Sequence, residues 1–224
     1  MSLELFKDRL HKSETPVQAQ QLIDAIIKGS DDTKKLLFNT PNPDEYKGKY
    51  ILGNHRKCNG FHDEKDPDCT DEQRICKCLY YKASNHSKVC SDCSYCNYPQ
   101  VEGRYKISDY EVPSKYRAKG IKVKNIDLVI SDTLDTNKDI LYATEAKPPR
   151  EDSPESILRM ISEIITYTIE DSRYKKAIIF FENSPQDKEY KTLHPKVKEL
   201  ILLADITVFR IFKNNRGNFE ICKL

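Results

Sequence analysis

The sequence has no apolar run close to the roughly 20 residues that a membrane-spanning helix needs. Its first residues, Met1–Asp8, are charged and lack the apolar stretch of a secretory signal. Lys and Arg number 37 against 35 Asp and Glu, so net charge alone indicates no polyanionic partner. We find no internal repeat and no low-complexity tract. We therefore expect a cytoplasmic protein without a membrane partner, formed by one sizeable domain or by one domain and a small module.

Cysteine is unevenly distributed, because seven of the eight cysteines lie between residues 58 and 96. In a reducing compartment such density more often indicates metal binding than disulfides. The last three form a Cys-x2-Cys-x2-Cys motif, whose short gaps let successive thiolates wrap one ion. The surrounding sequence is polar, so a metal would supply the folding energy that apolar burial cannot. The candidate ligands are Cys58, Cys69, Cys76, Cys78, Cys90, Cys93 and Cys96.

Two kinds of metal centre fit this region. Zinc takes four nitrogen or sulfur ligands, and His55, His62 and His86 could add nitrogen. A 4Fe-4S cluster also takes four thiolates, and the same spacing is familiar for one. Oxidised pairs or free thiols are the third interpretation. We expect Zn²⁺, in a metal-binding insertion at 54–98.

Helical and strand patterns alternate through the rest of the chain. Apolar spacing predicts helices at 15–29 and 31–38, a helix beginning at Ser153-Pro154, and another at 194–205. Apolar runs bounded by turn residues predict strands at 121–131, 139–147, 175–182, 206–213 and 219–223. This order favours an α/β (α+β) protein with a mixed β-sheet flanked by helices.

The predicted hairpin at 121–147 carries the residues with the clearest chemistry. Asp127 lies in its first strand, and Glu145-Ala146-Lys147 ends its second. Side chains two apart on a strand share a face, so Glu145 and Lys147 project together. Two carboxylates suffice for Mg²⁺, which keeps several waters, and a nearby ammonium could orient a water or stabilise an anionic phosphorane.

Asp127 followed by Glu145-Ala146-Lys147 resembles the PD-(D/E)XK nuclease superfamily, over roughly 121–181. Glu163 and Tyr167 are similar to the Gln-x3-Tyr motif of its RecB-like members, and an i, i+4 pair shares one helix face. The resemblance implies a restriction-endonuclease-like fold with Mg²⁺ on Asp127 and Glu145. It implies these catalytic residues: Asp127, Glu145, Lys147, Glu163 and Tyr167.

Two positions depart from the pattern, and a third feature separates the chain from one branch. Ile126 stands where many members have proline, and Glu163 stands where glutamine is usual. Glu163 could instead lie on a solvated face, and Tyr167 could simply pack. Iron–sulfur members of the RecB-like branch place one cysteine before the core and three after it. Here all seven precede the core, which favours zinc.

The segment at 97–124 is basic and contains interleaved tyrosines. Cations meet phosphates and aromatic rings stack on bases, so this mixture is typical of a nucleic-acid contact. The alternative is a solvated connector with tyrosines packed beneath it. The candidate DNA-binding residues are Arg104, Lys106, Lys115, Arg117 and Lys119.

Together these patterns predict a helical part of the core at 1–53, the metal-binding insertion at 54–98 and the nuclease core at 99–224. We expect a Mg²⁺-dependent DNA endonuclease, in the manner of a type II restriction enzyme, and the resemblance makes a homodimer plausible. One alternative is a catalytically degenerate nuclease fold that only binds nucleic acid or protein. Another is a RecB-like exonuclease of repair or CRISPR adaptation, with an iron–sulfur cluster.

Overall fold

A computed structural model describes residues 5–52, 72–83, 99–118, 125–134, 140–147, 149 and 155–224. Of Glu72, Gln73, Arg74 and Lys82 only the backbone is described. Most of the predicted metal ligands lie outside these residues, as does one predicted DNA-binding lysine. The residues concerned are Cys58, Cys69, Cys90, Cys93, Cys96 and Lys119.

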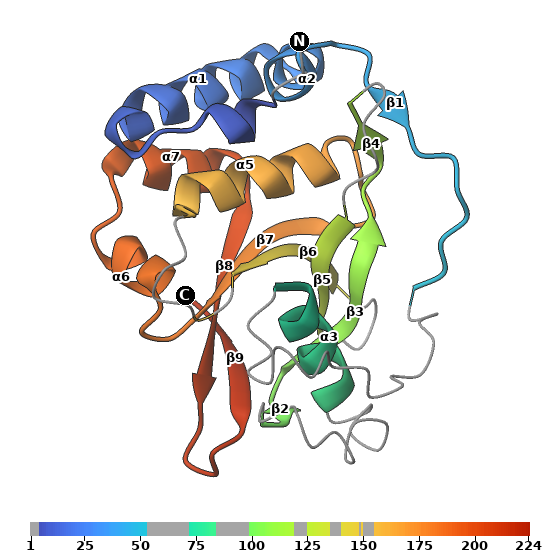
Figure 1. The fold of residues 1–224 in the computed structure, drawn as a ribbon, viewed down its shortest axis with the longest axis vertical. Coiled ribbons are helices and arrows are strands. Elements are labelled where there is room, and N and C mark those ends of the chain that lie inside the picture. Colours follow the sequence, from blue (N-terminus) through green and yellow to red (C-terminus); the bar gives the residue numbers. More distant parts are fainter. Residues whose placement is uncertain are drawn as a thin grey trace, which may run out of the picture.

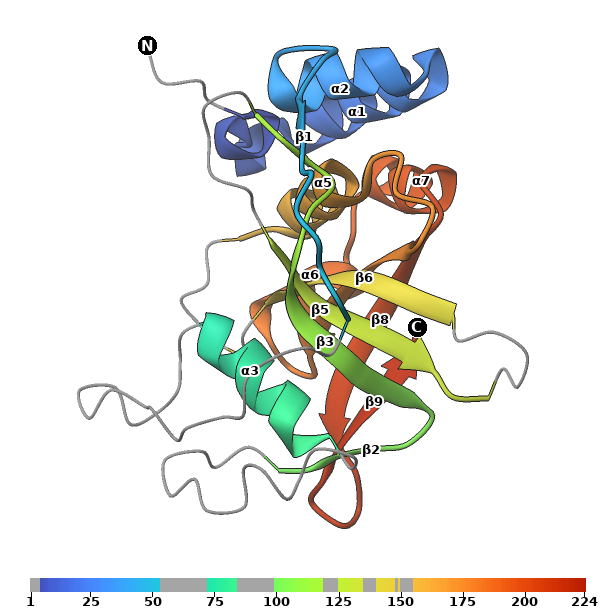
Figure 2. The ribbon, with the colours of Figure 1, turned by 90° about the vertical axis from the view of Figure 1, so that its right-hand side faces the viewer.

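A curled, mixed β-sheet forms the centre of the fold (Figures 1 and 2). Its strands, in spatial order, are β2 (Val101–Glu102), β9 (Phe219–Lys223), β8 (Ile206–Lys213), β7 (Lys175–Phe181), β6 (Ile140–Lys147), β5 (Asn125–Asp132) and β3 (Tyr105–Pro113). β6, β7 and β8 are parallel to one another. On one side of them β5 pairs antiparallel with β6 and with β3, and on the other side β9 pairs antiparallel with β8. β2 runs parallel to β9. A separate two-stranded sheet joins β1 (Asp44–Glu45) to β4 (Tyr116–Arg117).

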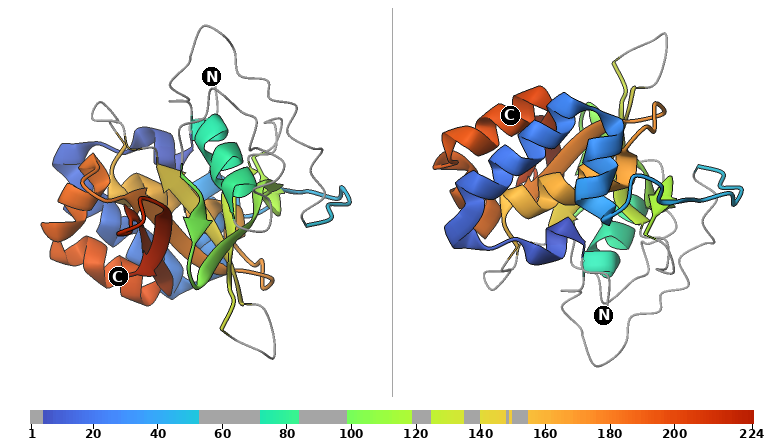
Figure 3. Two further views of the ribbon diagram at one scale, coloured as in Figure 1. Left: turned by 90° about the horizontal axis from the view of Figure 1, so that it is seen from below. Right: turned by 90° about the horizontal axis from the view of Figure 1, so that it is seen from above.

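Helices cover both faces of this sheet (Figures 1 and 3). The helices are α1 (Thr15–Lys28), α2 (Ser30–Phe38), α3 (Glu72–Lys82), α5 (Ile157–Thr168), α6 (Pro185–Lys191) and α7 (Pro195–Leu203), preceded by the 3-10 turns η1 (Phe6–Arg9) and η2 (Lys12–Glu14). α5 and α7 lie against one face with α1 and α2 above them, and α3 lies on the opposite face. Within the described part of the chain, no helix is both long and apolar enough to cross a membrane. The expected mixed sheet flanked by helices is confirmed.

Local signals located most of these elements. The predicted hairpin forms as antiparallel β5 and β6, and β8 and β9 have the predicted bounds. The predicted start of α5 is wrong: Ser156, rather than Ser153, precedes the helix, and its Oγ accepts a hydrogen bond from the Arg159 N–H at 3.3 Å. Serine is a good N-cap at either position, so sequence alone could not choose between them.

The sheet face that α5 and α7 cover, called the helical side below, is buried mainly by aliphatic residues, which form the helical-side core. α5 lies between the sheet and α2, which explains why its whole length from Ile157 to Thr168 is buried apart from Arg159. The crossover from β6 through α5 to β7 joins two parallel strands. This crossover places the middle of α5 over the end of β6, where Glu145 and Lys147 lie.

The opposite face has a second, more aromatic core. Phe209 of β8 is fully buried and meets the rings of Tyr105 and Tyr142, at centroid distances of 4.9 and 5.1 Å. Ile75 and Leu79 of α3 pack into the same cluster. Residues 72–83, which fall inside the predicted insertion, are therefore held on the sheet by apolar contacts.

Glu170, just after α5, links three elements. Its carboxylate accepts hydrogen bonds from Ser30 of α2 and from Tyr116 of β4 at 2.7 Å, and it pairs with Lys34 at 2.8 Å. Hydrogen bonds from Lys34, Ser30 and Tyr116 lower the pKa of Glu170 to about 2.

This depressed pKa predicts a pH-dependent contribution to stability. The folded pKa lies below the ordinary value of 4.5, so the contribution is complete above that value and is lost as the pH falls toward 2. We expect Glu170→Gln to lower the free energy of unfolding at pH 6 and to have a shrinking effect at lower pH. Urea unfolding of both proteins at pH 6, 4 and 3 measures this. A difference that stays constant with pH would show that the charge of Glu170 does not contribute.

Candidate active site

The ends of β5 and β6 bring the predicted acidic residues together. The antiparallel pairing includes Leu128 opposite Thr144, and continuing that register places Asp127 opposite Glu145. The Oδ2 atom of Asp127 accepts a hydrogen bond from the Ala146 N–H at 2.9 Å. The Asp127 side chain thus binds a backbone N–H group of β6 just beyond the last β5–β6 residue pair, and it lies beside the Glu145-Ala146-Lys147 segment.

Side chains alternate along β6, so Glu145 and Lys147 point toward the face of the sheet that α5 covers. Ala143 belongs to the helical-side core, whereas Ala146 belongs to the core on the α3 side. Glu145 and Lys147 share the face of Ala143, because side chains two apart point the same way. The predicted common face of the two residues agrees with this arrangement.

Lys147 lies among carboxylates and is 3% exposed. Its Nζ donates to Glu145 Oε1 at 2.8 Å and pairs with Glu155 Oε2 at 2.6 Å. Glu163 Oε2 lies 3.5 Å from the same nitrogen. The ammonium therefore joins β6, the residues before α5 and the middle of α5.

α5 supplies Glu163 and Tyr167 to the same cluster. Glu163 is 4% exposed and Tyr167 is 6% exposed, so the solvated-face interpretation of Glu163 is wrong. A second lysine contacts both side chains. Lys7 Nζ donates hydrogen bonds to Glu163 Oε1 and to Tyr167 Oη, each at 2.8 Å. The predicted i, i+4 pair shares one partner.

The surroundings shift the pKa values of the two buried glutamates, Glu145 and Glu163, in opposite directions. Burial, and then the charges of Asp127 and Glu163, raise the pKa of Glu145 well above its ordinary value. Burial also acts to raise the pKa of Glu163, but its interactions with the Glu145 carboxyl group and with the ammonium groups of Lys147 and Lys7 lower that pKa to about 2.

A partly exposed rim borders the buried cluster. Glu155 has a side chain that is 25% exposed, and that of Arg159 is 31% exposed. Arg159 lies 3.4 Å from Glu155 and 3.6 Å from both Glu163 and Asp8. A substrate could approach Lys147 from this side, since the deeper carboxylates are shielded from solvent.

Sequence reasoning missed three members of this cluster. Arg159 had a usable signal, because it lies four residues before Glu163 on one face of α5 and four residues after Glu155. Glu155 is close in sequence to the predicted motif. Lys7 had none, because its contact with Glu163 spans 156 residues.

The carboxylate oxygens match the ligands that Mg²⁺ prefers. Glu145 Oε2 and Glu163 Oε2 are buried and receive no hydrogen bond within the described part of the chain. Asp127 and Glu145 are the residues that would hold the ion. Among the described residues no group of three or more His, Cys, Asp or Glu is arranged as a metal site, so most ligands would be waters.

The predicted DNA-binding cations lie on β3, β4 and their flanks, where several form ion pairs or hydrogen bonds. Arg104 donates to both oxygens of Asp132 at 2.7 and 2.6 Å. Lys115 donates to the backbone carbonyl of Glu170 at 2.9 Å, and Arg117 lies 3.7 Å from Asp44.

Lys106 lies on β3, next to the buried Tyr105. Tyr105 and Tyr110 are buried in the core on the α3 side. For Tyr105 and Tyr110 the structure therefore agrees with packing in the core, which was the alternative to stacking on bases.

Cys76 and Cys78 are both buried on α3. Residues two apart on a helix are separated by about 200° around its axis, so the two thiols leave it on opposite sides. Cys76 packs into the core on the α3 side. A shared ion would therefore depend mainly on the cysteines outside the described residues.

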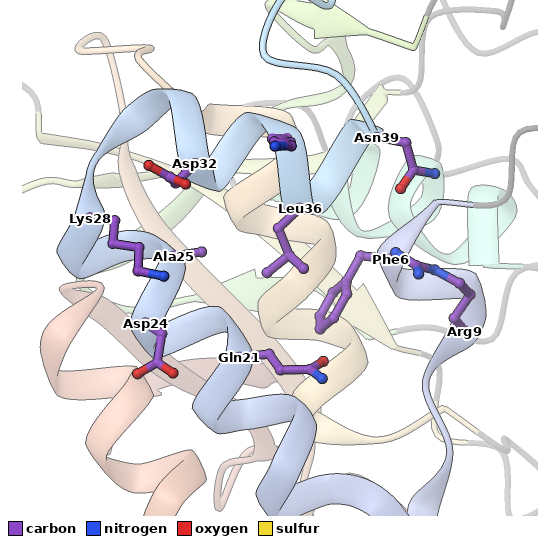
Figure 4. Close-up of a pocket in the computed structure, with 10 residues that line it drawn as sticks. Phe6, Arg9, Gln21, Asp24, Ala25, Lys28, Asp32, Leu36 and Asn39 are labelled. Carbon is purple, nitrogen blue, oxygen red and sulfur yellow. The ribbon is translucent and has the colours of Figure 1, made fainter.

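A surface hollow of about 550 Å³ lies between η1, α1 and α2. It includes none of the residues of the carboxylate cluster. Figure 4 shows Phe6 pointing into it between Leu36 and Gln21, and Phe6 is 4% exposed. This packing fixes η1 and hence the backbone that carries Lys7.

The chain matches no protein-family model, no curated protein and no solved structure. A functional assignment therefore depends on the chemistry of the residues themselves.

Proposed function

We propose that the protein is a Mg²⁺-dependent DNA endonuclease of the PD-(D/E)XK type. The observation that supports this most is the placement of Asp127 beside the Glu145-Ala146-Lys147 segment, with Lys147 Nζ 2.8 Å from Glu145. Glu163 and Tyr167 on the following helix join the same cluster. Acid, acid and lysine on adjacent strands, followed by these helical residues, is the arrangement that the resemblance implies.

In this proposal Asp127 and Glu145 would hold the ion, which would supply positive charge at the phosphate and lower the pKa of a bound water. Lys147 orients the attacking water and stabilises the charge that develops on the phosphoryl oxygens. Glu155 is the most exposed of the three carboxylates around Lys147, so it is the partner that an incoming phosphate would most readily displace. Glu163 holds Lys147 from the helical side.

The finer parts of the proposal derive from the resemblance. Double-stranded DNA as substrate, internal cleavage, a restriction-like role and a homodimer are predictions of this kind. We also propose that the cysteine-rich region binds Zn²⁺ and contacts the DNA, together with the basic segment that follows it.

We expect supercoiled plasmid to be cut by the wild-type protein with Mg²⁺ and to remain intact with EDTA. Asp127→Asn should abolish cutting, because an amide is a poorer ligand than a carboxylate while its shape is nearly the same. Asp32→Asn, which changes an exposed aspartate of α2, is the matched control and should cut like the wild type. Gel analysis of plasmid forms measures all three. Cutting in EDTA, or by Asp127→Asn at the wild-type rate, would contradict the proposal.

A binding protein with a degenerate site is the second candidate. One observation favours it: Lys147 and Glu145 neutralise each other and are 3% and 2% exposed. A wild-type protein that shifts DNA in a gel but cuts neither DNA nor RNA would support this candidate. Cutting of linear but not closed circular DNA would instead favour the exonuclease alternative.

A further inference from the structure

Lys7 reaches the carboxylate cluster from the opposite end of the chain. It lies in η1, ahead of α1, and is 6% exposed. Its Nζ donates to Glu163 Oε1 at 2.8 Å and to Tyr167 Oη at 2.8 Å, and lies 5.3 Å from the centre of the Tyr167 ring. A lysine buried to this extent needs charged and polar partners, and these contacts supply them.

Lys7 does not touch the residues assigned to the reacting atoms, but it is one contact away from them. Glu163 binds Lys7 through Oε1 and faces Lys147 through Oε2, 3.5 Å away. Lys147 in turn donates to Glu145 at 2.8 Å. The contacts form a continuous chain of alternating charge from Lys7 through Glu163 and Lys147 to Glu145.

We infer that Lys7 is a positioning residue for the phosphodiester hydrolysis proposed above, and this inference rests on that proposed function. The hydrogen bond from Lys7 to Glu163 Oε1 keeps the Glu163 carboxylate away from Lys147, so that Lys147 stays bound to Glu145 at the end of β6. Without Lys7, the cations left near the buried Glu163 carboxylate among the described residues would be Lys147 at 3.5 Å and the partly exposed Arg159 at 3.6 Å. Because a buried carboxylate needs a paired charge, Glu163 would move toward the more deeply buried Lys147. Lys147 would then be drawn away from the position at which it meets the substrate.

The N-terminal segment is placed firmly enough for this role. Leu5 and Phe6 belong to the helical-side core, and η1 contacts both α2 and α5. Asp8, the next residue, lies 3.6 Å from Arg159. Two consecutive residues of η1 therefore contact the α5 side of the site.

The test compares Lys7→Met with the matched control Lys12→Met, which changes an exposed lysine of η2. We expect Lys7→Met to lower kcat for plasmid cleavage about 10- to 100-fold, with little change in KM. Lys7→Arg, which retains charge and donors, should restore part of the rate. Mn²⁺ affinity, measured by calorimetry without substrate, should stay within about threefold of the wild-type value, since Lys7 touches neither proposed ligand.

A double-mutant cycle separates positioning from general stabilisation. If Lys7 acts through the charge of Glu163, Lys7→Met in a Glu163→Gln background should cost less than about threefold. Equal losses in both backgrounds, a rate for Lys7→Met that matches Lys12→Met, or a tenfold loss of Mn²⁺ affinity would each overturn the inference. A wild-type protein that cuts nothing would overturn the proposed function itself, whereas a cutting wild type with an unaffected Lys7→Met would overturn only the role of Lys7.

Discussion

Lys147→Met is expected to lower the rate of Mg²⁺-dependent plasmid cleavage about 10³-fold, because it removes the cation to which the proposed function gives the role of stabilising charge at the reacting phosphate. Methionine keeps an unbranched chain of similar length in a site that is 3% exposed. The variant should still bind Mn²⁺, since Asp127 and Glu145 remain. Single-turnover cleavage rates and calorimetric Mn²⁺ titration measure the two effects separately.

Stability has to be controlled in this variant. Lys147 pairs with Glu145 and Glu155, and loss of one partner of a buried ion pair costs about 3–5 kcal/mol. The rates are therefore compared at a temperature where thermal unfolding shows both proteins folded. Lys175→Met, which changes an exposed lysine at the start of β7, provides the matched control. A folded Lys147→Met protein that cuts DNA as fast as Lys175→Met would remove Lys147 from the mechanism.

Phe209→Ala is expected to lower the free energy of unfolding by about 3–5 kcal/mol, the usual cost of a large cavity in a core. Phe209 is fully buried, and the rings of Tyr105 and Tyr142 pack edge-on against it. Its removal leaves a cavity beside both rings. Urea denaturation at neutral pH measures the change.

The matched change for Phe209 is Leu202→Ala, because Leu202 on α7 is 81% exposed. Its effect should stay within about 0.5 kcal/mol. If both variants lost the same small amount of stability, the aromatic core on the α3 side would not be packed as described.

Sequence patterns predicted the parts of the fold that depend on local periodicity. The bounds of β8 and β9 came from apolar runs around the Asn214–Gly217 turn, and the hairpin of β5 and β6 came from alternation. β3 was missed, because its two tyrosines and Lys106 indicated a nucleic-acid contact rather than a strand. Its inward residues, among them Ile107 and Val112, are buried by long-range packing that the local pattern did not reveal.

Prediction of the site followed the same division. Asp127, Glu145 and Lys147 lie on paired strands, so strand periodicity and hairpin register were enough to bring them together. Alternation along β5 is not complete, however, because Ile126 belongs to the helical-side core whereas Leu128 and Ile130 belong to the core on the α3 side.

Lys7 and Glu155 illustrate what single-sequence reasoning could not provide. Each contributes a contact of 2.8 Å or less to a buried partner, but the spacing along the chain between each residue and that partner predicts no contact. Their places depend on how η1 and the start of α5 pack against the sheet. Such contacts are set by tertiary packing, and a pattern within one segment carries no signal for them.

The most direct test of the proposed site is the position of a bound ion. Crystals of the wild-type protein grown with Mn²⁺, a Mg²⁺ substitute with anomalous scattering, would show where the ion lies. The proposal predicts an anomalous peak within about 2.0–2.3 Å of oxygens of both Asp127 and Glu145, with waters completing the coordination. A fully occupied ion bound elsewhere, or none at saturating Mn²⁺, would contradict it.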